Sequence, residues 1–251
     1  MKLAAIVLTK NEERNIVACL ESLRWADGLI VLDSLSTDRT TQLAEEAGAR
    51  VLTRPFDHYA AQRNAALEAA DAEWVLFVDA DERVTPALAD EVREKVSTDA
   101  PLIAGYWLPR ENHIVGRVIR GGGWYPDYQL RLLRRGRARY DPARPVHEVV
   151  LLDGEAGYLR HPLIHYNYET WAQFHAKQRR YAELEALALY QQGVRPRPHH
   201  YVLQPWREFR RRYWTLAGYG DGLHGLRLSL YMAWYTLIAR LYLRSLWAQK
   251  R

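Results

Sequence analysis

Short apolar runs alternate with segments of helical periodicity along the front of the chain. The apolar runs, rich in Val, Leu and Ile, predict strands over residues 3–8, 28–32, 50–53 and 74–78. The segments between them predict helices capped by Asn11 and Ser36, and a third helix over residues 57–71. Thr85 and Pro86 are suited to cap and open a further helix. This alternation predicts an α/β fold with a mostly parallel sheet covered by helices on both faces.

Polar residues follow three of these predicted strands. They are Thr9 and Asn11 after the first strand, Asp33 after the second, and Asp79 and Asp81 after the fourth. The carboxyl ends of parallel strands meet at one edge of a sheet, and ligands bind there. We therefore expect these five residues to share a site although some of them lie about 70 positions apart in the sequence.

The segment "VLFVDADER" runs directly from apolar residues into three carboxylates, Asp79, Asp81 and Glu82. Such a concentration of negative charge is unfavourable unless a positive group lies close by. No glycine-rich loop follows the first strand, so both the dinucleotide fingerprint and the P-loop are missing. A divalent cation bound by carboxylates and substrate phosphates is the usual other solution. In an extended segment Asp79 and Asp81 point the same way, so they can serve one ligand; the alternative is a solvated strand end or a helix cap.

The ordered segments "AAIVLTKNEERNI", "GLIVLDSLSTDRT" and "AAQRNAALEAADAEWVLFVDADERV" resemble an inverting glycosyltransferase of family 2 with the GT-A fold. The resemblance covers roughly residues 1–150. The later segments "GGGWYPDYQLRLLRRGRARY" and "VHE" are similar to the branch that includes lipopolysaccharide core β-1,4-glucosyltransferases. The family implies a Rossmann-like, mostly parallel sheet flanked by helices and a nucleotide-sugar donor, usually linked to UDP.

The resemblance also assigns residues to the donor. Thr9 and Asn11 would lie against the nucleoside, and Asp33 would hydrogen-bond its base. Arg63 would contact the base or the diphosphate, and Asp79 would bind the ribose. Structural alternatives stay open: helix caps for Thr9 and Asn11, a turn for Asp33, and a solvated helix position for Arg63.

The implied reaction needs a metal ion and a base. Asp81 would bind Mg²⁺ or Mn²⁺ on the diphosphate, and His147 could be a further metal ligand. A carboxylate must take the proton of the attacking hydroxyl, and Asp127 is the first candidate and Glu148 the second. Asp127 could equally be a helix cap, and His147 with Glu148 a surface pair.

Arginines surround the candidate base. Seven of them lie between residues 117 and 139, and such a run is usually a solvated face. We single out Arg131 and Arg134 as candidates to meet the diphosphate or an anionic acceptor. His161 and His165 are interpreted as structural.

Composition places the chain among large globular proteins. It has 251 residues, of which 48% are hydrophobic, and one cysteine, Cys19, so an internal disulfide and a thiolate metal cage are excluded. The apolar start is short and runs into "TKNEE", which predicts a first strand and not a signal peptide. These features predict a cytoplasmic protein.

Charge divides the chain into two expected domains. Residues 1–159, the predicted nucleotide-sugar-binding and catalytic domain, have a balance of −5, whereas residues 160–251 have a balance of +10. The second part predicts a helical, basic and aromatic extension, with a helix ended by Gly193, breaks at Pro196, Pro198 and Pro205, and a long final helix. The longest uncharged stretch of that final helix has 12 residues, and a membrane span needs about 20. The helix fits either the membrane interface or packing on the core.

Taken together, the sequence predicts a metal-dependent inverting glycosyltransferase. It would move a hexose from a nucleotide-sugar, with UDP as the expected carrier, to a glycolipid or oligosaccharide such as the lipopolysaccharide core. The tail predicts peripheral binding to the inner face of a bacterial inner membrane, and nucleic acid is not an expected partner. The alternatives are a nucleotidyltransferase that makes nucleotide-sugars and a non-catalytic nucleotide-sugar-binding or membrane scaffold protein.

Overall fold

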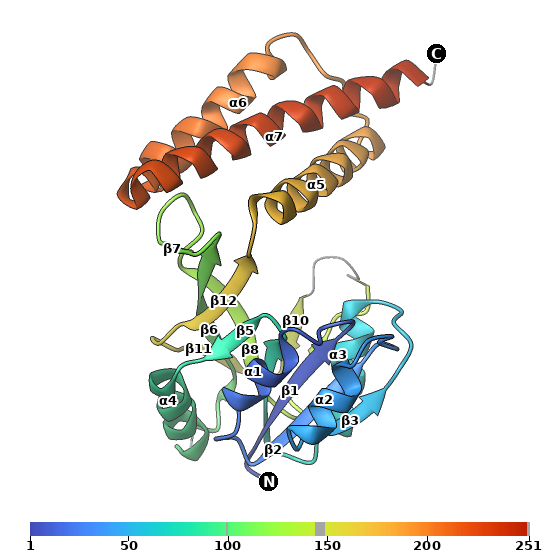
Figure 1. Ribbon diagram of the computed structural model, residues 1–251, viewed down its shortest axis with the longest axis vertical. Coiled ribbons are helices and arrows are strands. Elements are labelled where there is room, and N and C mark those ends of the chain that lie inside the picture. Colours follow the sequence, from blue (N-terminus) through green and yellow to red (C-terminus); the bar gives the residue numbers. More distant parts are fainter. Residues whose placement is uncertain (99, 144–148, 250–251) are drawn as a thin grey trace. The chain divides into compact units, whose positions relative to one another are not determined.

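Four parallel strands form the part of the sheet that the apolar runs predict. The computed structural model describes residues 1–98, 100–143 and 149–249 (Figure 1). The strands lie in the order β3-β2-β1-β4, with β1 at Leu3–Thr9, β2 at Gly28–Asp33, β3 at Arg50–Thr53 and β4 at Trp74–Asp79. Neighbouring strands pair in parallel, with Thr9 in register with Asp33. The predicted α/β class is confirmed.

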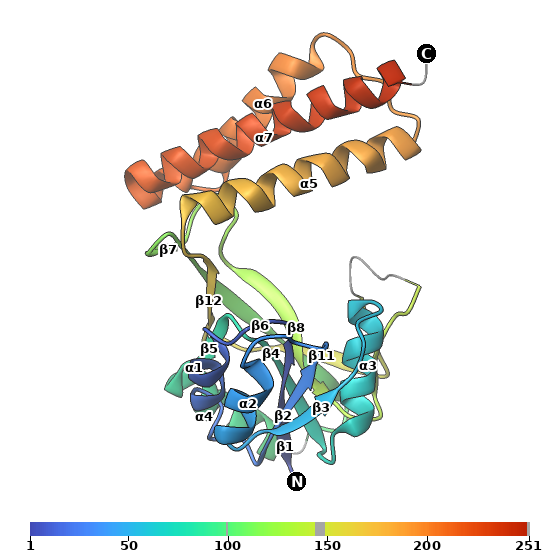
Figure 2. The same ribbon diagram turned by 45° about the vertical axis from the view of Figure 1, so that its right-hand side comes forward.

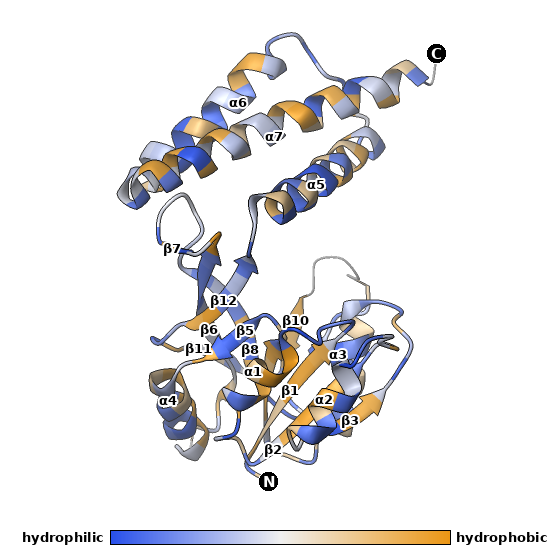
Figure 3. Ribbon diagram, in the orientation of Figure 1, coloured by the Kyte–Doolittle hydropathy of each residue, from blue (hydrophilic) through white to orange (hydrophobic). Residues whose placement is uncertain are grey.

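Helices cover both faces of these strands, as Figure 2 shows. They are α1 (Ile16–Glu21), α2 (Thr40–Glu46), α3 (Tyr59–Ala69) and α4 (Pro86–Ser97). Alternate residues of β1 divide between two hydrophobic clusters. One cluster contains residues of α1, α2 and α4, and the other contains residues of α3. Because both faces are buried, the strands are apolar almost throughout (Figure 3).

The sheet continues with mostly antiparallel partners. Beyond β4 the order is β8-β6-β12-β5, and β7 and β11 also pair with β6. The bounds are β5 Glu82–Val84, β6 Ile103–Ile114, β7 Arg117–Ile119, β8 Asp127–Arg134, β11 Glu155–Tyr158 and β12 Leu163–Tyr168. Two short strands, β9 (Ala138–Tyr140) and β10 (Val150–Leu152), form a separate pair.

The chain divides into two units. The first comprises Met1–Arg110 and Tyr128–His165, and the second comprises Glu111–Asp127 and Tyr166–Arg251. We expected a single division after residue 159. The segment Glu111–Asp127 belongs instead with the second unit, because its contacts are with that unit.

The second unit is built around three helices. They are α5 (Trp171–Gln191), α6 (His200–Arg210) and α7 (Gly222–Gln249), with a π-helical turn η1 (Arg211–Thr215) and a 3-10 turn η2 (Gly218–Asp221) between the last two. α7 packs against both α5 and α6 and buries Leu228, Ala233, Tyr235, Ala239 and Leu243. The final helix therefore packs within this unit, as one of its two interpretations expected. Within the described ranges, no helix has the length and apolar character to cross a membrane.

Three local predictions differ from the structure. α1 begins at Ile16 with Asn15 at its N-cap position, so Asn11, which adopts a left-handed conformation with φ 56°, does not cap it. α2 begins at Thr40, after a turn in which Asp38 accepts hydrogen bonds from Thr40. Pro205 lies inside α6 and does not end it.

Candidate functional site

Asp33 is a buried hydrogen-bond acceptor at the carboxyl ends of β1 and β2. The Thr9 hydroxyl donates to its Oδ1 at 2.8 Å. The Ser36 hydroxyl donates to the same oxygen at 2.6 Å, and the Ser36 backbone N–H donates to Oδ2 at 2.7 Å. Asp33 is only 1% exposed. The predicted meeting of Thr9 and Asp33 at one sheet edge is confirmed, and most acceptor positions of Asp33 are used inside the protein.

Asn11 joins the loop after β1 to the loop after β2. Its backbone N–H donates to the Ser36 hydroxyl at 2.8 Å, and its side-chain oxygen accepts from the Thr37 N–H at 2.8 Å. The side chain of Asn11 is exposed. Asparagine tolerates the left-handed conformation better than most residues, so the residue type suits this turn.

Asp79, at the end of β4, lies between two arginines. Arg131 donates from both terminal nitrogens, at 3.2 and 2.5 Å, and Arg63 donates at 3.1 Å. Burial by itself raises the pKa of Asp79, but the Arg131 and Arg63 guanidinium groups outweigh it and hold that pKa well below its usual range. Part of the positive charge that the segment "VLFVDADER" requires is therefore supplied by the protein.

Arg63 is 4% exposed and packs over the rings of Phe77 and Tyr140, at 5.2 and 5.6 Å from the ring centres. Its guanidinium group therefore lies beside Asp79 and within the core. We expected Arg63 to contact the base or the diphosphate of the donor; in the structure its guanidinium group pairs with Asp79 at 3.1 Å.

Glu82 is a further charged residue beside Asp79, and it is fully buried. It accepts the Asp79 backbone N–H at 2.8 Å, and Arg110 lies 3.3 Å from its other oxygen. Burial, reinforced by the negative charge of Asp79, raises the pKa of Glu82 above its ordinary value. Sequence reasoning counted Glu82 among the clustered carboxylates but did not identify Arg110 as its partner.

Asp81 lies in the turn between β4 and β5, and its side chain is 35% exposed. Its Oδ2 is 3.3 Å from Nε2 of His165. His165 is buried on β12, and its backbone lies opposite Glu82 of the neighbouring strand β5. Because the strand ends at Asp79, the expected alternation does not continue, and Asp79 and Asp81 have different partners. His165, interpreted from the sequence as structural, contacts a site residue.

The donor set around Asp81 suits a hard divalent cation that is held largely by a substrate. Within the described part of the chain, no group of three His, Cys, Asp or Glu side chains is placed to hold a metal ion. Mg²⁺ commonly takes only one or two carboxylates and completes its shell with water and phosphate oxygens. The partly exposed carboxylate of Asp81 fits that role. His147 and Glu148, the other predicted metal and catalytic residues, lie outside the described residues.

Asp127 and Arg134 lie at the two ends of β8. Asp127 is the first residue of β8 and belongs to the second unit. Arg134 lies at the other end of β8, where it pairs with Glu73 at 2.9 Å beside the start of β4. Of the two arginines singled out from the sequence, only Arg131 is at the carboxyl edge of the sheet.

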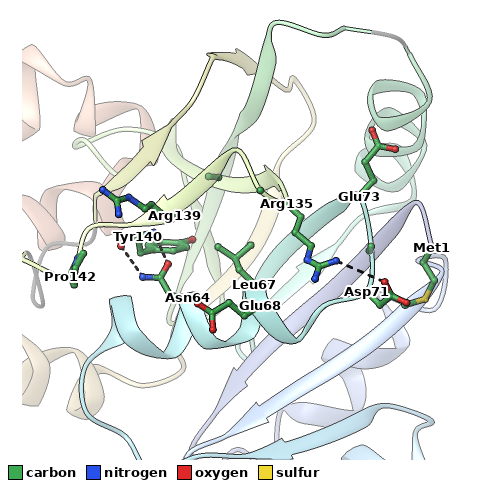
Figure 4. A pocket seen from close by; sticks show the side chains of 13 residues that line it. Met1, Asn64, Leu67, Glu68, Asp71, Glu73, Arg135, Arg139, Tyr140 and Pro142 are labelled. Atoms are coloured by element: carbon green, nitrogen blue, oxygen red, sulfur yellow. Dashed lines mark hydrogen bonds and ion pairs between the residues drawn. The ribbon is translucent and has the colours of Figure 1, made fainter.

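A cavity of about 900 Å³ lies at the opposite, amino edge of the parallel strands (Figure 4). Met1 and Glu73, which precede β1 and β4, line it together with Asn64, Asp71 and Arg135. Arg135 approaches Asp71 to 3.9 Å. Ligands of open α/β sheets bind at the carboxyl edge, so this cavity is not the candidate donor site.

Comparison with known proteins identifies the family to which the chain is similar. The family model described as glycosyl transferase family 2 matches residues 4–166. The lipopolysaccharide core biosynthesis glycosyltransferase LpsC of Rhizobium meliloti (strain 1021) is 30% identical over 252 residues, covering 97% of this chain and 93% of that protein.

Solved structures match over shorter stretches. Staphylococcus aureus TarS is 20% identical with a TM-score of 0.43, covering 74% of this chain and 40% of TarS. Glucosyl-3-phosphoglycerate synthase from Mycobacterium tuberculosis, solved with Mn²⁺, UDP and glucosyl-3-phosphoglycerate, is 25% identical with a TM-score of 0.36, covering 46% of this chain and 44% of that one. The chain thus spans less than half the length of these two structures.

Proposed function

This chain belongs to glycosyl transferase family 2, and from that premise we propose that it transfers a hexose from a nucleotide-sugar to a glycolipid with inversion at the anomeric carbon. The observation that carries the proposal is the position of Asp81. Its partly exposed carboxylate lies at the carboxyl edge of the sheet, next to an Asp79 that two arginines already neutralise. A carboxylate so placed is available to a cation that accompanies a diphosphate.

The nucleoside would lie over the ends of β1 and β2. Thr9 and Asp33 are joined there by a hydrogen bond. The exposed Asn11 links the loop after β1 to the loop after β2. Asp33 would offer its remaining acceptor position to the base, with uracil as the expected base. Asp79, held in one orientation by Arg63 and Arg131, would accept a hydrogen bond from the ribose.

Asp81 would hold Mg²⁺ or Mn²⁺, with His165 orienting its carboxylate and His147 as a predicted further ligand. When bound, the cation stabilises the negative charge that gathers on the leaving diphosphate. Arg131 and Arg63, which pair with Asp79, add positive charge at the same edge of the sheet. This preorganised charge is the contribution of the chain itself to departure of the nucleotide.

The acceptor hydroxyl must lose its proton as it attacks the sugar. We propose Asp127 as the base, with Glu148 as the alternative that the sequence leaves open. The relative LpsC carries the printed description of lipopolysaccharide core biosynthesis. By that similarity, we propose a lipopolysaccharide core or a related glycolipid as acceptor, which would place the reaction at the inner face of a bacterial inner membrane.

Calorimetric titration of UDP tests the proposal. Wild-type protein should bind UDP with Mn²⁺ and lose binding in EDTA, and Asp81→Asn should bind UDP weakly under both conditions. Asp71→Asn is the matched control, because Asp71 lies at the amino edge and is 94% exposed. Metal-independent binding that survives in Asp81→Asn would contradict the assigned site. Binding of GDP, CMP or dTDP in place of UDP would change the donor and leave the family assignment intact.

A further inference from the structure

Helix α6 of the second unit exposes large apolar side chains to solvent. The helix is strongly amphipathic, yet none of its eleven residues, all of them described, is buried. Its half-buried positions are largely polar: Gln204 accepts a hydrogen bond from Arg240 of α7, and Glu208 lies close to Arg212. A surface helix ordinarily buries its apolar stripe. Here the apolar side of the helix is left to solvent.

The exposed side continues from α6 through η1 into η2. We call it the α6 aromatic surface; its exposed members are Val202, Leu203, Trp206, Trp214 and Tyr219, and the half-buried rings of Phe209 and Tyr213 contact them. Its rings form one contiguous group, with Trp206 and Trp214 each within 6.0 Å of Phe209. Trp206 is 53% exposed and Trp214 is 50% exposed. A contiguous exposed group of large apolar side chains marks an interaction surface.

Positive charge surrounds this surface. From α6 through η2, residues 200–221 contain four arginines and two acidic residues, Glu208 and Asp221. Asp221 accepts hydrogen bonds from the backbone N–H groups of Arg120 and Gly121. Arg211 and Arg212 pair with Glu208 at 2.9 and 2.5 Å, so its negative charge is neutralised within the protein. Arg207 and Arg210 are exposed on the same helix. The surroundings therefore complement a negatively charged partner.

We propose that the α6 aromatic surface binds the interface of an anionic lipid bilayer. Tryptophan and tyrosine have an apolar ring and a polar group, so they favour the headgroup level of a membrane. Val202 and Leu203 would reach the boundary of the acyl chains while Arg207 and Arg210 pair with lipid phosphates. A helix of this kind lies in the plane of the membrane and does not cross it.

The proposal moves the membrane contact from the final helix, where we expected it, to α6. Much of the apolar surface of α7 is used against α5 and α6. The inference extends the proposed function, because a glycolipid acceptor lies in a membrane. It does not depend on sugar transfer, so a failure of either proposal can be recognised separately.

Flotation of the full chain with lipid vesicles tests the proposal. Wild-type protein should float with vesicles of phosphatidylglycerol and phosphatidylethanolamine and bind phosphatidylcholine vesicles far less. The double variant Trp206→Ser with Trp214→Ser should weaken partitioning on the order of tenfold. Arg207→Gln with Arg210→Gln should weaken it by about fivefold for each arginine at low salt. Trp234→Ser on α7, at a residue 54% exposed, is the matched control and should bind as wild type.

Unchanged flotation of the double tryptophan variant, or equal release of Trp234→Ser, would overturn the proposal. So would wild-type protein that binds an RNA oligonucleotide but no vesicle. If the double variant does not fold, as judged by circular dichroism, a labelled variant decides. Cys19 is buried, so Leu203→Cys can be labelled selectively with an environment-sensitive fluorophore. Its emission should shift to the blue with anionic vesicles, the same label at Trp234→Cys should not, and the absence of a shift at position 203 refutes the bilayer contact.

Discussion

Both terminal nitrogens of Arg131 face the carboxylate of Asp79, at 3.2 and 2.5 Å, although 52 residues separate the two in the chain. The pair joins the end of β4 to the antiparallel strand β8 beside it. It explains why a buried strand can run directly into several carboxylates. It also means that the donor edge of the sheet is built on internal ion pairs before any ligand arrives.

Removal of Arg131 is expected to destabilise the protein. Arg131→Met removes the arginine that contacts both oxygens of Asp79, and loss of one partner from a largely buried pair costs about 3 kcal/mol. Arg134→Met is the control, because Arg134 pairs with Glu73 in a more exposed setting and its loss should cost at most about 1 kcal/mol. Urea denaturation measures both, and equal losses would show that the Asp79 pair has no special weight.

Replacement of His165 should weaken metal-dependent nucleotide binding. His165→Leu keeps a similar side-chain volume but removes the contact that orients Asp81. Loss of a group that orients a metal ligand typically lowers metal affinity by about 10–100-fold. The Mn²⁺ concentration for half-maximal UDP binding, measured by calorimetry, should rise accordingly. His161→Leu, which alters a pair with Glu91 instead, should leave it unchanged; an equal rise in both variants would refute the role of His165.

Replacement of Asp127 is predicted to lower the turnover rate without changing the affinity for the donor nucleotide. A general base contributes about 10²–10⁴-fold to the rate, so Asp127→Asn should lower kcat by that order while UDP affinity stays the same. Asp153→Asn, at an exposed position, serves as control. Steady-state kinetics with a glycolipid acceptor provides the measurement. Retained turnover in Asp127→Asn together with its loss in Glu148→Gln would transfer the role to Glu148.

Glu91 should make stability depend on pH. Burial alone raises the pKa of its carboxyl, but hydrogen bonds from the His161 and Arg160 backbone N–H groups, at 2.9–3.1 Å, outweigh burial and lower it. A lowered pKa means that the ionised form is stabilised by folding. The contribution is complete above the unfolded value and disappears as the pH falls through the folded value.

Glu91→Gln tests this dependence. The variant should be less stable than wild type by about 1–3 kcal/mol at pH 7, and the difference should shrink as the pH falls below the ordinary carboxyl range. Urea denaturation at a series of pH values measures it. A difference that stays constant down to acid pH would mean that the Glu91 charge does not contribute.

Gly225 should not tolerate alanine although it lies in a helix. Glycine to alanine ordinarily stabilises a helix by up to about 1 kcal/mol. Here the added Cβ would lie 1.9 Å from the backbone oxygen of Gly218, so the 3-10 turn would have to move. Gly225→Ala is expected to cost about 1–3 kcal/mol. Gly220→Ala is the control, because no heavy atom lies within 4 Å of its added Cβ. Thermal unfolding compares the two, and a stabilised Gly225→Ala would contradict the close packing of η2 on α7.

The sequence determined those features that depend on local chemistry. Apolar periodicity located the four parallel strands to within one residue of their ends, and Thr85 caps α4 as its residue type predicts. The ordered motifs identified the family, and the rule that parallel strands end at one edge brought Thr9 to Asp33. Each of these inferences uses neighbouring residues or a general rule of sheet architecture, and neither needs the path of the later chain.

Only the tertiary structure decided which charges meet. Arg131 was one of seven arginines in a short stretch, and nothing local distinguishes it from Arg134, three positions later on the same strand. Because β8 pairs antiparallel with β4, Arg131 lies near Asp79 at one end of β4 and Arg134 lies near Glu73 at the other. His165 reaches Asp81 because β12 pairs with β5, and α6 turns its apolar side outward because its polar side meets α7. Side-chain pairing across the sheet and between helices follows from register and packing, and register is set by the whole fold and not by any segment of it.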